Sequence, residues 1–198
     1  MGKFFSAVYD PVMQPLENSR FGRIRKNLIR KAKGKVLDIG SGTGLNFPYY
    51  TEAVESVDAI EPDPAMRGQS VERARDAPVP IRLHAARAED LPFPDQSFDS
   101  VTAALVFCTI PYPSLALREI ERVCRPGGEV LFWEHVRLDQ PVLGKLQDIL
   151  TPGWKRVADG CHLNRDTLSL IRESRLEIKE VEEYYSGLFL VIRCKKPA

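Results

Sequence analysis

The chain has 198 residues, of which 43% are hydrophobic and 28% are charged, a balance typical of a globular domain rather than of a disordered, fibrous or membrane-spanning chain. Its four cysteines show neither a C-x-x-C pair nor the spacing of Cys and His zinc ligands, so we expect no disulfide framework and no metal. The longest mostly apolar run, residues 101–110, is far shorter than the about 20 residues that span a bilayer, which favours a cytoplasmic protein.

The net charge of +1 hides a basic N-terminal region, since residues 1–50 contain nine Lys or Arg and three acidic residues. Residues 20–35 hold eight of these basic residues and no acidic one, with Phe21, Ile24 and Leu28 at helical spacing. This pattern predicts a basic amphipathic helix. Two interpretations stay open: the helix packs on the sheet with a solvated charged face, or it makes peripheral contact with anionic membranes.

Further along the chain, short apolar or β-branched runs alternate with segments of helix-forming composition. The predicted strands are residues 35–39, 56–60, 81–85, 100–105 and 129–133, and the predicted helices are residues 65–75 and 115–124. The tail breaks the alternation, because residues 176–183 and 188–194 are typical of an antiparallel hairpin. The pattern predicts an α/β fold, a Rossmann-like doubly wound sheet of seven strands that is mostly parallel.

The first predicted strand leads directly into the turn DIGSGTG, residues 38–44. Glycine allows a sharp turn and lets a ligand lie against the backbone, so this turn predicts a nucleotide-cofactor site. Its spacing differs from G-x-G-x-x-G and from the lysine-containing P-loop, which disfavours dinucleotides and nucleoside triphosphates. Glu61 follows the second predicted strand, where an acidic side chain can accept both hydroxyls of a ribose.

Four motifs, in order, make the sequence similar to the class I S-adenosylmethionine-dependent methyltransferases with a type 11 domain: VLDIGSGTG, AIEPD, AEDLPFPDQSFDSV and RVCRPGGEVLFWEH. The resemblance covers nearly the whole chain and implies the cofactor S-adenosyl-L-methionine, with S-adenosyl-L-homocysteine as product. Arg87 stands where the closest relatives often have an aspartate for the adenine amine, so backbone groups and Glu89 stay open for that contact. The residues that the resemblance assigns to the cofactor are Asp38, Gly40, Ser41, Gly42, Thr43, Gly44, Glu61, Pro62, Ala88, Glu89 and Leu105.

After the fifth predicted strand the sequence resembles a narrower group, the alkyl-thiol S-methyltransferases of the methyltransferase-like seven group. The likeness is carried by FWEHV at 132–136, a PGWK turn at 152–155 and ADGCHLNRDT at 158–167, while YDP at 9–11 resembles the group's cofactor-capping segment. This resemblance implies one domain over residues 1–198. Its parts are a capping and basic helical segment (1–34), a cofactor-binding core (35–134), a substrate-side insert (135–165) and a C-terminal helix and hairpin (166–198).

Direct methyl transfer requires a site that aligns donor and acceptor and excludes water. A thiol is partly ionised at neutral pH, and a nearby histidine can take its proton or stabilise the anion. The catalytic candidates are therefore His135 and His162, followed by Asp159 and Tyr9; each histidine has the alternative of a structural, hydrogen-bonded role. The expected walls of the substrate pocket are Phe107, Trp133, Trp154 and Cys161.

These features predict a methyltransferase acting on a small apolar nucleophile, with a thiol favoured. Three alternatives stay open: a phosphatidylethanolamine N-methyltransferase at a membrane surface, a small-molecule O- or N-methyltransferase, and a sensor that binds S-adenosylmethionine without methyl transfer. Nucleic acid is not an expected partner, since no Asn/Asp-Pro-Pro-aromatic motif follows the fourth predicted strand. The expected assembly is a monomer or homodimer.

Overall fold

A computed structural model describes residues 3–198, with side chains from Tyr9 onward, and places there one sheet of seven strands in the order β3-β2-β1-β4-β5-β7-β6. Strands β1 to β5 are parallel, and β7 runs antiparallel to β5 and β6. This confirms the predicted mostly parallel sheet with a C-terminal hairpin. The strands are β1 (Gly34–Ile39), β2 (Val54–Ile60), β3 (Ile81–His84), β4 (Phe98–Ala104), β5 (Cys124–His135), β6 (Glu177–Tyr184) and β7 (Phe189–Lys195).

Helices cover both faces of the sheet, which is why its central strands are apolar on both sides. In β5, Phe132 faces the core that α4 and α6 close, whereas Leu131 faces the core that α2 closes, as the two-residue period of a strand requires. The α-helices of the described chain are α1 (Lys3–Glu17), α2 (Arg20–Ile29), α3 (Pro64–Arg75), α4 (Pro113–Val123), α5 (Pro141–Val157) and α6 (Thr167–Arg172).

Three local predictions differ from the structure. Helix α2 begins at Arg20 as predicted but ends at Ile29, because Gly34, with a φ of 66°, already begins β1. Strand β5 begins at Cys124, not at residue 129 as predicted, and takes up residues 125–128 in an irregularity of its pairing with β4. The PGWK segment is not a turn: it lies inside α5, which continues through Pro152.

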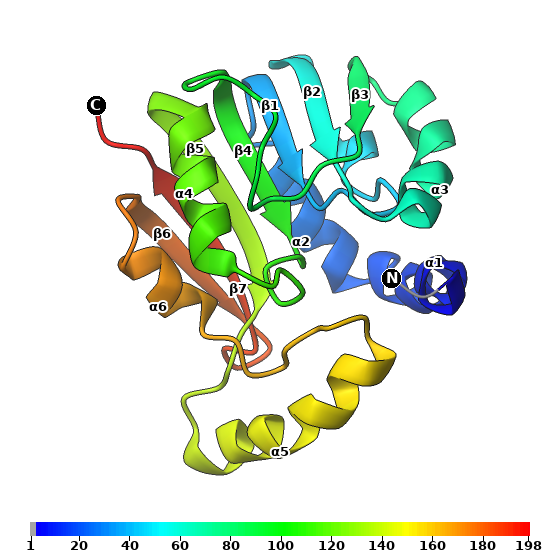
Figure 1. Cartoon of the computed structure of the whole chain (residues 1–198), viewed down its shortest axis with the longest axis vertical. Helices are drawn as coiled ribbons and strands as arrows, with labels where there is room; N and C mark the ends of the chain where they lie inside the picture. Colours follow the sequence, from blue (N-terminus) through cyan, green and yellow to red (C-terminus); the bar gives the residue numbers. More distant parts are fainter. Residues whose placement is uncertain (1–2) are drawn as a thin grey trace.

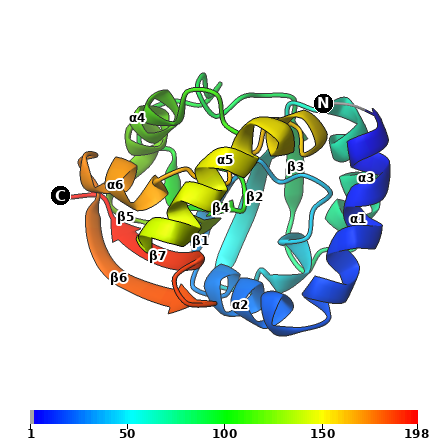
Figure 2. The ribbon, with the colours of Figure 1, turned by 90° about the horizontal axis from the view of Figure 1, so that it is seen from below.

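The carboxyl ends of the parallel strands face α5, which lies below the sheet in Figure 1. Viewed from that side in Figure 2, α5 crosses in front of the strand ends and α1 runs along one side, next to α3. Open α/β sheets bind ligands at this edge. None of the helices in residues 3–198 has the length and apolar character needed to cross a bilayer.

Candidate functional site

The glycine-rich turn after β1 is open toward the carboxyl edge of the sheet. Gly40 and Gly42 have positive φ angles of 59° and 55°, and a Cβ on Gly40 would lie 2.1 Å from Cγ2 of Val106, so only glycine fits at this position. Ser41, the residue between them, has a buried hydroxyl with no hydrogen-bond partner in the described chain. A bound ligand would satisfy that group.

Asp38 supports this turn from inside the protein. Its Oδ1 accepts hydrogen bonds from Nδ2 of Asn46 at 2.9 Å and from the hydroxyl of Thr102 at 2.9 Å. Burial raises the pKa of Asp38 to about 6, although these two hydrogen bonds lower it. Asp38 is fully buried and lines neither cavity, so it can hold the turn in place without touching a ligand.

Glu61, at the end of β2, is only 3% exposed and is tied to the same turn. Its Oε2 accepts from the backbone N–H of Gly42 at 3.1 Å, and its Oε1 accepts from that of Asp63 at 2.8 Å. Burial raises the pKa of Glu61, against both backbone hydrogen bonds. Each carboxylate oxygen keeps a free lone pair, so Glu61 can still accept two ribose hydroxyls.

Two cavities of about 440 and 500 Å³ meet at Glu61. They share the lining residues Gly40, Glu61, Val106, Thr109 and Asp159. The smaller cavity adds Pro62, Arg87, Ala88 and Glu89, and the larger adds Ser41, Gly42, Thr43 and Leu105. The structure thus brings together all the predicted cofactor residues except Asp38 and Gly44. Gly44 has a φ of 85° and packs beside Phe47, where a Cβ would lie 2.7 Å from the ring.

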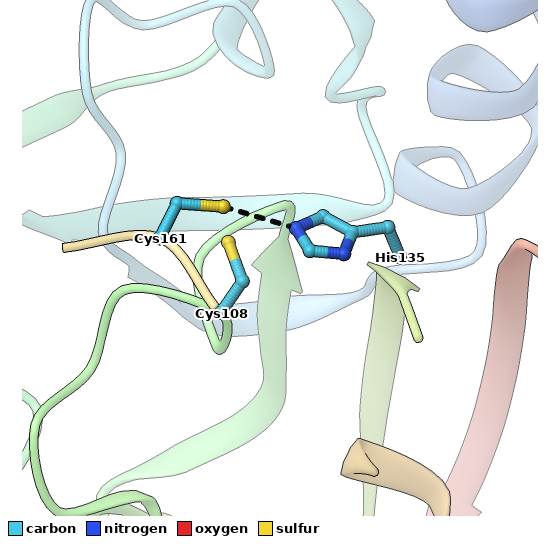
Figure 3. A group of neighbouring side chains, drawn as sticks. All are labelled: Cys108, His135 and Cys161. Atoms are coloured by element: carbon cyan, nitrogen blue, oxygen red, sulfur yellow. Dashed lines mark hydrogen bonds between the residues drawn. The ribbon is translucent and has the colours of Figure 1, made fainter. Parts of the chain in front are cut away.

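The larger cavity continues along apolar side chains to three polar groups that we call the Cys-His-Cys cluster: Cys108, His135 and Cys161 (Figure 3). Nε2 of His135 lies 3.2 Å from Sγ of Cys161, and the ligand atoms of all three residues lie within 4.8 Å of one another. The apolar lining comes mainly from α1, α5 and the β6–β7 turn, and includes Val12, Met13, Leu16, Trp154, Val157, Leu188 and Phe189.

The cluster favours a thiolate at Cys161. A hydrogen bond from Cys108 lowers the pKa of Cys161, and His135 lowers it further, while burial opposes both. The same hydrogen bond and burial raise the pKa of Cys108. Burial alone would lower the pKa of His135, but the neighbouring Cys161 raises it above its ordinary value. These shifts favour an anionic sulfur at Cys161, next to the imidazole of His135.

Buried groups hold the turn that carries Cys108. Oε1 of Glu134 accepts from the backbone N–H groups of Val106 and Phe107 at 3.0 and 3.1 Å. Burial raises the pKa of Glu134 to about 7. The turn starts at Leu105, which has a φ of 57°, a region that non-glycine residues rarely occupy. Neither Glu134 nor Cys108 stood out in the sequence, because their importance arises from contacts between separate strands.

The other catalytic candidates lie in three different settings. His162 lines neither cavity: its Nδ1 lies 3.1 Å from the carbonyl oxygen of Cys108 and 2.9 Å from Nη2 of Arg165, so it supports the cluster from behind. Asp159, with a φ of 50°, lies where the two cavities meet. Tyr9 lines the larger cavity, and burial raises its pKa to about 12.

Of the expected pocket walls, the structure brings only Cys161 and Trp154 to the cavity. Trp133 is instead fully buried under α2, with its ring 5.1 Å from that of Phe21. Phe107 is buried in the other core, 5.3 Å from the ring of Phe132. Both lie in the interior because alternate residues of a strand face opposite sides and the turn after β4 points Phe107 inward.

Comparisons with known proteins agree with this geometry. Residues 37–132 match the Methyltransf_11 family, described as a methyltransferase domain. The chain is 34% identical over 152 residues to thiol S-methyltransferase TMT1B of Rattus norvegicus, covering 74% of this chain and 62% of that protein. It is also 32% identical over 171 residues to the phosphatidylethanolamine N-methyltransferase of Cereibacter sphaeroides, covering 82% of this chain and 80% of that protein.

Among solved structures, a SAM-dependent methyltransferase from Aquifex aeolicus superposes with a TM-score of 0.66 at 16% identity, covering 87% of this chain and 89% of that one. At this identity the likeness concerns the fold alone. The chain spans about three fifths of the length of the rat thiol S-methyltransferase, so activities of that whole protein carry over only as hypotheses.

Proposed function

The chain belongs to the class I S-adenosylmethionine-dependent methyltransferases, and we propose that its methyl acceptor is a small apolar thiol. The turn after β1 fits the cofactor: a Cβ is excluded at Gly40, and the buried hydroxyl of Ser41 has no partner in the described residues. When bound, S-adenosyl-L-methionine supplies an electrophilic methyl group. The remaining question is which residues orient it and which nucleophile approaches.

We assign the two cavities to two parts of the reaction. Glu61 would accept the ribose hydroxyls, and the smaller cavity, with Ala88 and Glu89, would hold the adenine. The turn at Gly40 to Thr43 would hold the amino-acid part, at the start of the larger cavity. The methyl group would then point along the larger cavity, toward the Cys-His-Cys cluster.

The observation that carries the thiol proposal is the composition of the larger cavity. Its walls are mainly apolar from the glycine turn to the cluster, and its polar end pairs Sγ of Cys161 with Nε2 of His135 at 3.2 Å. Apolar walls favour an alkyl chain and exclude water, and the imidazole of His135 can take the proton of a thiol or stabilise its anion. Similarity to the rat thiol S-methyltransferase supports the same acceptor.

One alternative has specific support. The match with this chain extends over 80% of the Cereibacter phosphatidylethanolamine N-methyltransferase, but over only 62% of the rat thiol S-methyltransferase. Helix α5 also exposes apolar side chains next to the larger cavity, including Val142 at 78% and Ile149 at 75%. A lipid headgroup amine is therefore the second candidate acceptor, reached from a membrane surface. The thiol is favoured because the cluster offers sulfur and imidazole groups.

The test is S-adenosyl-L-homocysteine formation by the purified protein with three acceptor sets. These are small alkyl thiols, vesicles containing phosphatidylethanolamine, and a panel of phenols and amines. We expect turnover with alkyl thiols, increasing with chain length until the cavity is filled. Turnover with vesicles alone would replace the thiol proposal by lipid N-methylation, and turnover with the phenol and amine panel alone would identify an O- or N-methyltransferase. Cofactor binding without turnover in any set would favour the sensor.

A further inference from the structure

We propose that Cys108, His135 and Cys161 bind one Zn²⁺ ion, and that this ion binds the sulfur of the acceptor as its fourth ligand. The metal site is inferred from these three side chains alone. Only the identity of the fourth ligand rests on the proposed thiol methylation. No signal in the sequence pointed to a metal, because the three ligands lie on separate segments of the chain: the turn after β4, the end of β5 and the loop after α5.

The spacing of the three ligand atoms is close to that of a tetrahedral zinc site. Zn–S distances of about 2.3 Å and Zn–N distances of about 2.0 Å place tetrahedral sulfur and nitrogen ligands about 3.6 Å apart, and two sulfurs about 3.8 Å apart. Nε2 of His135 and Sγ of Cys161 are 3.2 Å apart, and all three ligand atoms lie within 4.8 Å of one another. Shifts of up to about 1 Å would bring all three pairs to these distances.

The directions of the side chains also suit a shared ligand. In Figure 3, the sulfur of Cys161 points toward the imidazole of His135 and the sulfur of Cys108 points toward that of Cys161, although the residues come from three backbone segments. Two cysteines and one histidine form a donor set that zinc prefers.

The site would be open on one side, as in catalytic rather than structural zinc centres. Cys108 is buried, but His135 and Cys161 are half-buried and all three line the larger cavity. Catalytic zinc sites combine three protein ligands with a fourth position for water or substrate. Here the fourth position would face the cavity that also reaches Gly40 and Leu105, so the acceptor and the methyl donor would meet there.

Outer contacts hold the ligands in place. Glu134 binds the backbone at Val106 and Phe107, just before Cys108. The backbone N–H of His162 donates to the carbonyl oxygen of Cys108 at 2.9 Å, which ties the Cys161 loop to the Cys108 turn. Such contacts orient metal ligands and contribute strongly to metal affinity.

The chemistry of this site balances without an oxidant or reductant. The acceptor thiol binds Zn²⁺ as its thiolate and releases its proton to solvent. Its sulfur lone pair forms the new S–CH₃ bond while the bond from that carbon to the sulfonium sulfur breaks, and the electron pair of the broken bond stays on S-adenosyl-L-homocysteine. The product is a neutral thioether, a weaker ligand than a thiolate, so it leaves the metal.

The test uses the full chain without a histidine tag, prepared with Zn²⁺ or Co²⁺ and freed of unbound metal by gel filtration. We expect about one zinc per chain in wild type. Cys161→Ser and His135→Ala should each weaken metal affinity by more than about 100-fold, since even outer contacts contribute 10- to 100-fold. Cys194→Ala is the matched control, because Cys194 is buried in β7 far from the cluster in the sheet, and it should retain the metal.

The Co²⁺ protein gives a readout that does not depend on activity. We expect thiolate-to-cobalt charge-transfer absorption and the visible bands of tetrahedral Co²⁺, and ethanethiol should change these visible bands in wild type. Equal metal content in wild type and Cys161→Ser would overturn the metal site. Bands that do not respond to ethanethiol would overturn the role of the acceptor as fourth ligand.

Thiol turnover, measured in the same preparations, separates this proposal from the proposed function. Full turnover by metal-free wild type would overturn the zinc proposal and leave thiol methylation standing. If the Co²⁺ spectrum responds to ethanethiol but no S-adenosyl-L-homocysteine forms, the metal site is supported. Only the proposal of thiol methylation is then contradicted. Should a ligand variant fail to fold by circular dichroism, the wild-type metal content and Co²⁺ spectrum still decide the proposal.

Discussion

Glu61 joins the glycine turn to the start of α3, because one carboxylate accepts from the backbone of both Gly42 and Asp63. We expect Glu61→Ala to weaken binding of S-adenosyl-L-homocysteine at least tenfold, since a hydrogen bond to a charged acceptor contributes about 1.5–3 kcal/mol. Titration calorimetry measures this affinity. Glu89→Ala, which removes a carboxylate from the smaller cavity only, is the comparison, and unchanged affinity in Glu61→Ala would refute the ribose assignment.

Asp38 makes folding stability depend on pH. Its pKa is about 6 in the folded protein against an ordinary value of 3.8, so the folded state holds this proton more tightly than the unfolded state. Between pH 4 and pH 6 the contribution of Asp38 to stability therefore falls as pH rises, by about 3 kcal/mol in total, and it is constant above that range.

Asp38→Asn removes this dependence and keeps an oxygen for Asn46 and Thr102. We expect the variant to gain stability relative to wild type as pH rises from 4 to 7, measured by urea unfolding at each pH. Other carboxyl groups titrate in both proteins, so the difference between the two curves is the quantity to follow. A difference that stays constant over this range would contradict the assignment.

At the scale of single residues, the local signals were sufficient to find the residues that line the cavities at the glycine turn, and not those of the Cys-His-Cys cluster. Gly40 and Glu61 stand at positions where a strand ends, and a strand end is visible in the sequence as the end of an apolar run. Cys108 and Glu134 have no such marker. They become important only because β4 and β5 are neighbours in the sheet, which places Glu134 under the turn that carries Cys108.

Among the elements, α2 shows how a basic helix can be structural. Its Arg25 is 3% exposed, forms a two-pronged ion pair with Glu17 at 2.6 and 3.0 Å, and donates to Oδ1 of Asn46 at 2.7 Å. The guanidinium also lies 4.9 Å from the centre of the Trp133 ring. Arg25 thereby joins α1, α2 and the segment after the glycine turn.

We expect Arg25→Met to lower the free energy of unfolding by roughly 3 kcal/mol, because it leaves Glu17 and Asn46 without their partner. Arg23→Met, on the exposed face of the same helix, should change it by no more than about 0.5 kcal/mol. Urea unfolding of the two variants checks this contrast. Equal effects would mean that the ion pair contributes no more than a surface contact.

Contact of residues 20–35 with anionic membranes stays a prediction, and the structure narrows which side chains can carry it. Phe21, Ile24 and Leu28 are buried in the core under α2, so only exposed basic side chains can face a lipid surface, among them Arg23, Lys26 and Arg30. Changing these three to Glu should abolish sedimentation with anionic vesicles and leave turnover of soluble alkyl thiols unchanged. Vesicle binding that survives this change would point to another surface.

Helices α1 and α5 were not predicted, because their compositions lack the usual signals of a helix. Each contains proline, which normally ends a helix, and α5 exposes most of its apolar side chains instead of burying one face. Periodicity predicts a helix when one side is buried, so a helix that lies beyond the strand ends and covers a cavity is difficult to detect.

For the whole molecule, the strands were predictable and the position of the last pair was not. The apolar runs that form β1, β2 and β4 are buried on both faces, which leaves a clear pattern. The hairpin was also expected, but nothing local determines that β7, rather than β6, pairs with β5. The order of the two strands depends on how much apolar surface each one buries in the complete sheet. Ile192 and Cys194 of β7 are fully buried, whereas β6 is largely exposed.

Removal of residues 189–198 should therefore cause aggregation. Without β7, strand β5 becomes an open edge next to an apolar face, and such edges pair with other chains. We expect loss of soluble protein and increased binding of a hydrophobic dye by whatever stays in solution. Removal of residues 197–198 alone is the control and should leave both properties unchanged, since neither residue belongs to a strand.

The position of β7 between β5 and β6 also orders events during synthesis. Strands β1 to β4, with the glycine turn and Glu61, leave the ribosome well before residues 189–195, so the cofactor half can begin to fold while the chain is still growing. His135, at the end of β5, pairs with Phe189 of β7, and this pairing must wait until that residue emerges. A nascent chain would thus gain the ability to bind its cofactor before it completes the site for the acceptor.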